Sequence, residues 1–122
     1  MPNYSKYTAL EVWKQARELA SNIYELTSSF PKNEQFGLTS QMRRCVISIP
    51  SNIAEGCGRQ HQKETVHILS ISRGSLYELE TQLFISKDLN FITQDQLTHF
   101  LKKVENLGKL INGFIRYYHQ KA

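Results

Sequence analysis

Apolar residues in the segment 38–56 recur at the spacing of an α-helix, and this periodicity constrains the fold more than any other feature of the chain. When each residue advances about 100° around a helix axis, one narrow stripe collects Leu38, Met42, Cys45, Ile49, Ile53 and Gly56. Such a stripe is typical of the face that a helix buries against its neighbours. Strand-like alternation is nowhere sustained, so we expect an all-α fold.

A second apolar stripe occupies a different side of the same predicted helix. It consists of Val46, Ile47, Pro50 and Ala54. A helix in a small bundle needs only one apolar face, so a second one indicates a second contact. We expect another copy of the chain to cover this stripe, which would make the protein a homo-oligomer.

Pro50 lies inside the predicted helix. An internal proline removes one backbone hydrogen bond and costs about 3 kcal/mol unless the loss is compensated. We expect a kink at this position. The alternative is that the segment breaks into two short helices at the proline.

Four helical segments account for nearly all of the 122 residues, which we expect to form a single domain, 1–122. Their expected ranges are about 9–29, 37–55, 62–88 and from 93 onward. Short connections between long helices predict an antiparallel up-down-up-down four-helix bundle, kinked at Pro50.

Local signals predict several helix ends. Gly56 and Gly58 lie where a left-handed cap would end the second helix, because glycine adopts that conformation most easily. Asn90 ends the third helix. Thr93 begins the fourth as its N-cap, with Gln96 three residues later completing a capping box.

Polar residues form a third stripe on the second helix, directly beside the core stripe. Its members are Gln41, Arg44, Ser48, Ser51, Asn52 and Glu55. Arg73 and Glu80 intrude in a similar way on the apolar face of the third helix. We expect a hydrogen-bonded charge network, made of Arg44, Asn52, Glu55, Arg73 and Glu80, to fix the pairing of these two helices. A buried charge without a partner costs several kcal/mol, so a buried network has to be nearly complete.

No combination of residues indicates catalysis. His61, Glu64 and His67 resemble a metal-binding group, but residues six apart on a helix point about 120° away from each other, whereas chelating pairs lie three or four residues apart. The sequence has no glycine-rich phosphate loop, nucleophile elbow or zinc motif. Cys45 and Cys57 are spaced wrongly for a redox or zinc pair, and we expect Cys45 to be a small core residue. We therefore predict no enzymatic activity, no metal and no cofactor.

Basic charge is concentrated in two segments of the chain. Residues 41–63 carry a net charge of +3 and residues 101–122 carry +4, whereas residues 64–100 carry −3. In the last helix Lys102, Lys109 and Arg116 are seven residues apart and lie outside the core stripe, which gives a line of positive charge about 21 Å long. A phosphate backbone can follow such a line.

Two interpretations of this charge stay open. In the first, RNA or DNA binds a basic surface made of Arg43, Arg59, Lys63, Lys102, Lys109 and Arg116. In the second, the row on the last helix pairs with Glu11, Glu18 and Glu25, which recur at the same interval on the first helix. The protein would then be a structural or adaptor assembly that contacts another protein without binding nucleic acid.

Membrane and export signals are also missing from the sequence. No run approaches the roughly 18 apolar residues of a membrane span, and the first residues, MPNYSKY, do not resemble a secretory signal. We expect a soluble cytoplasmic protein with no membrane partner.

Three segments carry a family resemblance. They read LEVWKQARELASNIYELTSSFP, FGLTSQMRRCVISIPSNIAEGCGR and SRGSLYELETQL. On these segments the chain closely resembles the bacterial 23S rRNA intervening-sequence protein family, over nearly its full length. The resemblance implies an antiparallel four-helix bundle that assembles as a ring of five subunits.

The same resemblance extends to the accessory variability determinant of diversity-generating retroelements, a basic pentamer that binds nucleic acid and a reverse transcriptase. It implies no catalytic role for any residue. The expected function is therefore that of a non-enzymatic, oligomeric binding protein associated with nucleic acid.

Overall fold

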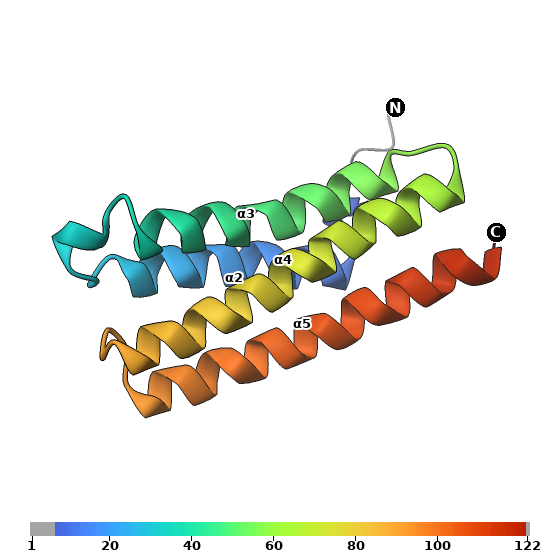
Figure 1. Cartoon of the computed structure of the whole chain (residues 1–122). Coiled ribbons are helices and arrows are strands. Elements are labelled where there is room, and N and C mark those ends of the chain that lie inside the picture. Colours follow the sequence, from blue (N-terminus) through green and yellow to red (C-terminus); the bar gives the residue numbers. More distant parts are fainter. Residues whose placement is uncertain (1–6, 122) are drawn as a thin grey trace.

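The computed structural model describes residues 7–121, and four long helices within them pack into a bundle (Figure 1). The helices are α2 (Glu11–Thr27), α3 (Leu38–Cys57), α4 (Gln62–Asp88) and α5 (Gln94–Lys121). A short 3-10 helix, η1 (Lys32–Glu34), lies in the connection between α2 and α3. The described residues contain no strand, so the predicted all-α class is confirmed.

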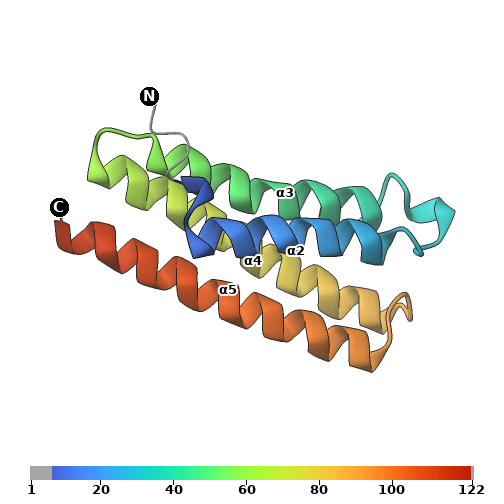
Figure 2. The ribbon, with the colours of Figure 1, turned by 180° about the vertical axis from the view of Figure 1, so that it is seen from behind.

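Successive helices run in opposite directions, as Figures 1 and 2 both show, which gives the predicted up-down-up-down order. Each helix packs against two neighbours, and α5 closes the bundle by contacting both α4 and α2. The contact between α2 and α5 is the least extensive of the four. The first turn of α2 and the last turn of α5 consequently lie at the same end of the bundle.

The predicted core stripe of α3 is confirmed. Met42, Ile49 and Ile53 are fully buried, and Cys45 is 5% exposed. They pack with apolar side chains from the other three helices, such as Ile23, Leu76, Leu83, Leu107 and Ile111. Each fully buried aliphatic side chain stabilises the fold by about 1.5–3 kcal/mol.

The beginning of α5 and the end of α4 are capped at the residues that the sequence predicts. The Thr93 N–H donates to Gln96 Oε1 at 2.8 Å, and the Gln96 N–H donates to Thr93 Oγ1 at 3.1 Å. This reciprocal pair is a capping box. At the end of α4, Asn90 has a φ of 62°, and the Phe91 N–H donates to the Ser86 carbonyl at 2.9 Å. That bond completes a Schellman motif.

The predicted glycine cap of α3 is wrong. None of the described glycines has a positive φ, and Gly58 has a φ of −88°. The Gly58 N–H donates to the Glu55 carbonyl at 3.1 Å, while the Gly56 carbonyl accepts a hydrogen bond from Thr65 Oγ1 at 2.9 Å. These bonds satisfy the end of the helix, so the chain does not need a left-handed residue there.

Pro50 lies within one continuous helix, so the alternative of two short helices is wrong. The expected kink stays a prediction. Side chains donate to the carbonyls of the two residues before the proline: Asn52 Nδ2 to Ser48 at 2.8 Å and Ser72 Oγ to Ile49 at 2.9 Å. These bonds supply donors close to the position where proline lacks an N–H.

Candidate functional site

The predicted charge network between α3 and α4 does not form. Arg73 donates from Nη1 to Asn112 Oδ1 on α5, at 3.0 Å. Glu55 instead pairs with Arg59, just beyond the end of α3, with an N–O distance of 2.6 Å. The predicted partners of these two residues were therefore wrong, because Arg73 finds its partner on α5 and Glu55 finds its partner in the connection after α3.

The other three members are also engaged elsewhere or exposed. Asn52 donates to the Ser48 carbonyl of its own helix. Arg44 is exposed and Glu80 is half-buried, and no ion pair within the described residues joins either of them to a carboxylate or a cation. Because water solvates these charges, no buried network is needed.

Small neutral groups link α3 to α4 instead. Ser48 Oγ lies 2.7 Å from Ser75 Oγ and 2.6 Å from the Cys45 carbonyl. Cys45 Sγ donates to the Ser75 carbonyl at 2.9 Å, and Ser72 Oγ donates to the Ile49 carbonyl at 2.9 Å. Each such bond contributes about 0.5–1.5 kcal/mol, and together they fix the register of the two helices.

The two cysteines are free and poorly suited to nucleophilic chemistry. Burial, together with its interactions with the Glu78 carboxylate, raises the pKa of the Cys45 thiol to about 12. Burial also raises the pKa of Cys57. A thiol in this state holds its proton at neutral pH, so neither residue is an activated nucleophile. The prediction that Cys45 is a small core residue is confirmed.

A groove of about 500 Å³ lies beside this interface, on the outer side of α3 and α4. Phe36, Arg44 and Ser48 line it from one side, and Glu78 and Gln82 line it from α4. Gln82 is 7% exposed, and its Oε1 is buried without a hydrogen-bond partner in the described structure. An unpaired buried polar group costs about 1–3 kcal/mol. Gln82 was not among the predicted site residues, although a glutamine beside the apolar Leu83 is a visible signal in the sequence.

The basic row on α5 lies at the surface. Lys102, Lys109 and Arg116 are all exposed. Lys109 approaches Glu105 of its own helix at 4.0 Å, and both side chains are well solvated. No ion pair within the described residues joins this row to another helix.

Arg43 does not belong to the basic surface in the way that was predicted. Its Nε donates to Thr27 Oγ1 at 2.9 Å, and Nη2 donates to the Tyr24 carbonyl at 3.1 Å. Its guanidinium also lies over the Tyr24 ring, 4.6 Å from the ring centroid. Arg43 therefore ties α3 to α2, and we correct its assignment from nucleic-acid contact to interhelical contact.

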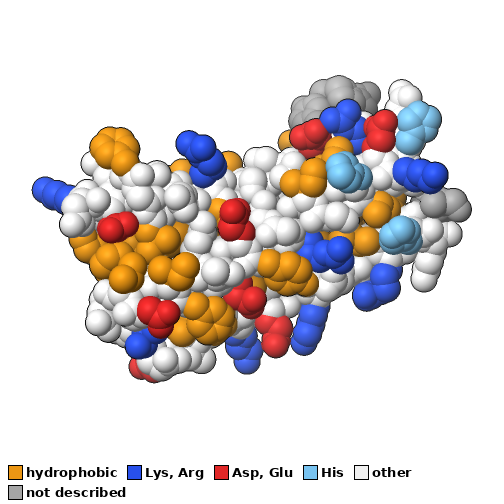
Figure 3. Space-filling view, in the orientation of Figure 1, with side chains coloured by type: hydrophobic (Ala, Val, Ile, Leu, Met, Phe, Trp, Pro, Cys, Tyr) orange, Lys and Arg blue, Asp and Glu red, His pale blue; other side chains and the backbone are white. Residues whose placement is uncertain are grey.

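Arg59 and Lys63 lie at the end of the bundle where α3 ends and α4 begins, and both are exposed. Figure 3 shows Lys, Arg and His side chains gathered at this end, with a few carboxylates among them. A pocket of about 440 Å³ is lined there by Arg59, Lys63, Glu64 and His67. The last turns of α5 lie at this same end of the bundle (Figure 1).

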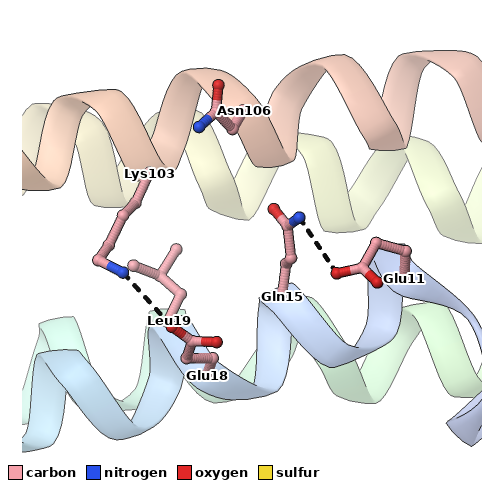
Figure 4. A pocket seen from close by; sticks show the side chains of 6 residues that line it. All are labelled: Glu11, Gln15, Glu18, Leu19, Lys103 and Asn106. Carbon is pink, nitrogen blue, oxygen red and sulfur yellow. Dashed lines mark hydrogen bonds and ion pairs between the residues drawn. The ribbon is translucent and has the colours of Figure 1, made fainter.

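The acidic row of α2, made of Glu11, Glu18 and Glu25, lies beside the contact between α2 and α5, which is the least extensive contact between helices in the bundle. Figure 4 shows Lys103 extending from α5 toward Glu18, at an N–O distance of 3.5 Å, in a pocket of about 260 Å³. Glu11 lines the same pocket and accepts a hydrogen bond from Gln15, whereas Glu25 lines a second pocket further along. The predicted pairing of this row with the basic row does not occur, because the residue that meets Glu18 is Lys103.

The predicted outer apolar stripe of α3 is only partly at the surface. Val46 is fully buried in the core of its own chain, so it was wrongly placed in an interface. It lies only about 40° from Met42 around the helix axis, which is within the wide face that α3 presents to its neighbours. Ile47 is 44% exposed, and Pro50 and Ala54 are half-buried.

A more extensive apolar surface lies on α4. Its exposed large hydrophobic residues are Ile71, Tyr77, Phe84 and Ile85, and Leu89 follows directly after the helix. Figure 3 shows hydrophobic side chains in patches over the face that α4 crosses. A Cβ added to Gly74, in the middle of this helix, would meet no other atom within 4 Å. Packing within the chain therefore does not require a glycine at this position.

No three His, Cys, Asp or Glu side chains in residues 7–120 converge where they could hold a metal ion. None of the helices in the described part of the chain combines the length and the apolar character that a bilayer-crossing segment needs.

The fold and its surfaces define an all-α four-helix bundle with one basic end, a polar groove and an apolar outer face on α4. The chain belongs to the 23S rRNA-intervening sequence protein family, whose model matches residues 8–113. A solved protein from Bacteroides thetaiotaomicron, described as a protein with unknown function from the S23 ribosomal protein family, has a similar fold, with a TM-score of 0.80. The two chains are 24% identical, and the similarity covers 86% of this chain and 95% of the other. No curated protein matches the chain.

Proposed function

We propose that the protein is a non-enzymatic homo-oligomer whose basic surface binds the phosphate backbone of RNA or DNA. The carrying observation is the row of Lys102, Lys109 and Arg116, which is exposed along α5 and unpaired with other helices in the described structure. Arg59 and Lys63 extend the surface at the end of the bundle. A ring of five subunits is the assembly that the family resemblance implies, and it would repeat this surface around the ring.

Phosphate contact has a quantitative signature. Three cations that each neutralise one phosphate should make the affinity fall roughly 20- to 40-fold between about 50 and 200 mM salt, because binding releases counterions. The test is fluorescence anisotropy with a labelled RNA and a labelled DNA of equal length, at a series of salt concentrations. Affinity that is absent at low salt would overturn the proposal.

The decisive variant changes Lys102, Lys109 and Arg116 to glutamine. We expect it to bind more weakly and to show a shallower salt dependence, with an unchanged melting temperature. The control changes Lys14, Arg17 and Lys32 to glutamine. It removes the same amount of charge from exposed positions in the first third of the chain, outside α5. Equal weakening in both variants would mean that net charge, rather than the row, governs binding.

The proposed assembly rests on apolar surface that the single chain leaves open. Four large hydrophobic side chains on α4 are exposed, and Leu89 directly after the helix is exposed as well. A helix that is apolar on its outer face is typical of a buried position. We propose that this face and the α3 patch of Ile47, Pro50 and Ala54 contact neighbouring copies. These two patches lie on different elements, and a contact between unlike patches generates rings when the rotation closes.

Light scattering at micromolar concentration tests the assembly. Ile71→Lys and Ile47→Lys should each lower the mass toward that of a 14.2 kDa monomer. Ser21→Lys, at an exposed position on α2, serves as the control and should leave the mass unchanged. A monomer mass for the unaltered protein would contradict the proposed homo-oligomer.

A second candidate function is a structural assembly without nucleic acid. The favouring observation is that the acidic row of α2 and the basic row of α5 share one interval but do not pair within the chain. In a ring of parallel bundles, α5 of one copy would run antiparallel to α2 of the next. This arrangement would place Glu11 opposite Arg116, Glu18 opposite Lys109 and Glu25 opposite Lys102.

Charge reversal separates the two candidates. If the rows pair between copies, Lys102→Glu should weaken the assembly, and adding Glu25→Lys should restore it. If the row binds phosphate, Lys102→Glu should weaken nucleic-acid binding and leave the mass of the oligomer unchanged. Adding Glu25→Lys should then have no effect on the mass of the oligomer.

A further inference from the structure

Three aromatic side chains gather in the last turns of α5, where the basic row ends. The ring of Tyr117 lies within 12° of parallel to that of Phe114, with 6.4 Å between the ring centroids, and it meets the Tyr118 ring edge-on at 5.2 Å. Phe114 and Tyr118 pack against the hydrophobic core, whereas Tyr117 is 48% exposed. The core therefore holds two of the rings, and these two support the third at the surface.

This support favours stacking of a ligand on Tyr117. A tyrosine has only two rotatable side-chain bonds and offers a large contact area, so holding it in place costs little conformational entropy. The contacts with Phe114 and Tyr118 restrict the ring further before any ligand arrives. A ring that is already held in place binds more tightly than a mobile one that makes the same contacts.

Arg116, the last residue of the basic row, lies next to this ring across a glycine. On the surface of α5, Gly113 falls between Arg116 and Tyr117, which follow it by three and four residues. A Cβ built on Gly113 would lie 3.7 Å from Arg116 Nη2, so the guanidinium reaches back to the glycine. Because Gly113 has no side chain, a flat group has room to lie between the cation and the ring.

Other exposed aromatic side chains in the described residues do not combine these features. Tyr24 lies under the guanidinium of an arginine from α3. Phe36 lies in the connection between α2 and α3, and Tyr77 and Phe84 lie on the outer face of α4. Within the described chain, Tyr117 is thus the exposed aromatic residue that directly adjoins the basic row of α5.

A cation beside an aromatic ring matches the chemistry of a nucleotide in a single strand. The phosphate is an anion that a guanidinium binds, and the base has a flat face that stacks on an aromatic side chain. In a duplex both faces of an internal base are covered by its neighbours, so the ring contributes nothing there. In a single strand the bases are accessible, and stacking adds to the phosphate contacts.

We propose that the end of α5 binds single-stranded nucleic acid, with a base stacked on Tyr117 and a neighbouring phosphate at Arg116. This inference rests on the proposed function, because the basic row supplies the phosphate contacts, and it adds the class of strand. Lys102 and Lys109 bind the backbone further along the same strand, on the same side of α5.

The experiment measures fluorescence anisotropy on the full-length protein with short labelled strands of equal length. The probes are an RNA and a DNA strand without self-complementarity, each alone and annealed to its complement, and a DNA strand whose bases are replaced by abasic sites. We expect the normal single strands to bind at least about fivefold more tightly than the abasic strand, because one stacked base contributes that much. At salt concentrations that weaken phosphate contacts, they should also bind more tightly than the duplexes.

Variants at the ring separate stacking from charge. Tyr117→Leu should weaken single-strand binding at least about fivefold, with unchanged duplex binding and an unchanged salt dependence. Tyr117→Phe keeps the ring and should bind like the parent. Gly113→Leu fills the space beside the ring and should also weaken single-strand binding, although it should melt no lower, since leucine is the better helix former. The control, Phe36→Leu, removes an exposed ring far from α5 and should change neither affinity.

Two results would overturn this inference. One is an abasic strand that binds as tightly as the normal strand. The other is a Tyr117→Leu variant that loses single-strand and duplex binding equally, because Tyr117 would then act through the fold.

The proposed function can survive that failure. If the glutamine variant of Lys102, Lys109 and Arg116 weakens binding while Tyr117→Leu does not, the phosphate contact stands and the stacking is wrong. If the parent protein binds none of the probes at low salt, both proposals are wrong.

Discussion

Lys103 of α5 meets Glu18 of α2 at an N–O distance of 3.5 Å, and this is the one ion pair between different helices in the described residues. Their side chains are 30% and 66% exposed, so water screens the attraction. Exposed pairs of this kind contribute about 0–1 kcal/mol. The pair nevertheless shows which charges of α2 and α5 meet. Lys103 engages Glu18, whereas Lys102 and Lys109 form no ion pair with α2 in the described residues.

The first prediction concerns this pair. Glu18→Gln should change the free energy of unfolding by less than about 0.5 kcal/mol, because the pair is solvated. Urea denaturation at low and high salt measures the effect. A loss above 1 kcal/mol that disappears in high salt would show that the pair holds α2 to α5 more strongly than its exposure indicates.

Loss of the capping box at the start of α5 should change the free energy of unfolding more than loss of the Lys103–Glu18 pair. Thr93→Ala should lower the free energy of unfolding by about 1 kcal/mol, because the Gln96 N–H loses its acceptor. Thr98→Ala, at an exposed position in the next turn of the same helix, is the matched control. Equal effects of the two changes on urea unfolding would argue against a specific cap.

Ser72 tests the neutral contact between α3 and α4. Its hydroxyl is fully buried and donates to the Ile49 carbonyl, next to Pro50. Ser72→Ala should therefore lower the free energy of unfolding by about 0.5–1.5 kcal/mol, since it removes a buried hydrogen bond between the two helices. Ser70→Ala removes a bond that stays within α4 and should cost less. Thermal and urea unfolding of both variants give the comparison.

The raised pKa of Cys45 predicts that the free energy of unfolding depends on pH in the alkaline range. Its pKa rises from 9.0 to about 12 in the folded protein, so the folded state holds the thiol proton more tightly than the unfolded state. The resulting stabilisation is complete below pH 9 and is lost as the pH rises toward 12. Unfolding free energies in this window should fall more steeply for the parent protein than for Cys45→Ala. Parallel slopes would contradict the prediction.

Arg43 should behave as a structural residue. Arg43→Gln should lower the free energy of unfolding by about 1–2 kcal/mol, because it removes bonds to Thr27 and Tyr24 and the contact with the Tyr24 ring. The salt dependence of any nucleic-acid binding should not change. Arg59→Gln, which removes an exposed pair, is the control for stability.

Periodicity predicted the parts of the fold that depend on one helix at a time. Met42, Ile49 and Ile53 are buried where a 3.6-residue period places them, and Thr93 with Gln96 forms a cap that involves only neighbouring residues. Such features are visible in the sequence because their geometry is local.

Features that depend on the distance between helices were not predictable. Arg73 meets Asn112, which is 39 residues later in the chain, and no spacing within α4 indicates that contact. Val46 is buried because the face that α3 presents to its neighbours is wider than a single stripe. The groove at Glu78 and Gln82 likewise exists only once α3 and α4 are packed side by side.

The even number of antiparallel helices places the beginning of α2 and the finish of α5 at one end of the molecule, the end that also bears Arg59 and Lys63. A purification tag or a reporter fused to either terminus would therefore crowd the basic end and interfere with measurements of it. Labels placed in the connection around η1 would lie at the far end and leave that surface free.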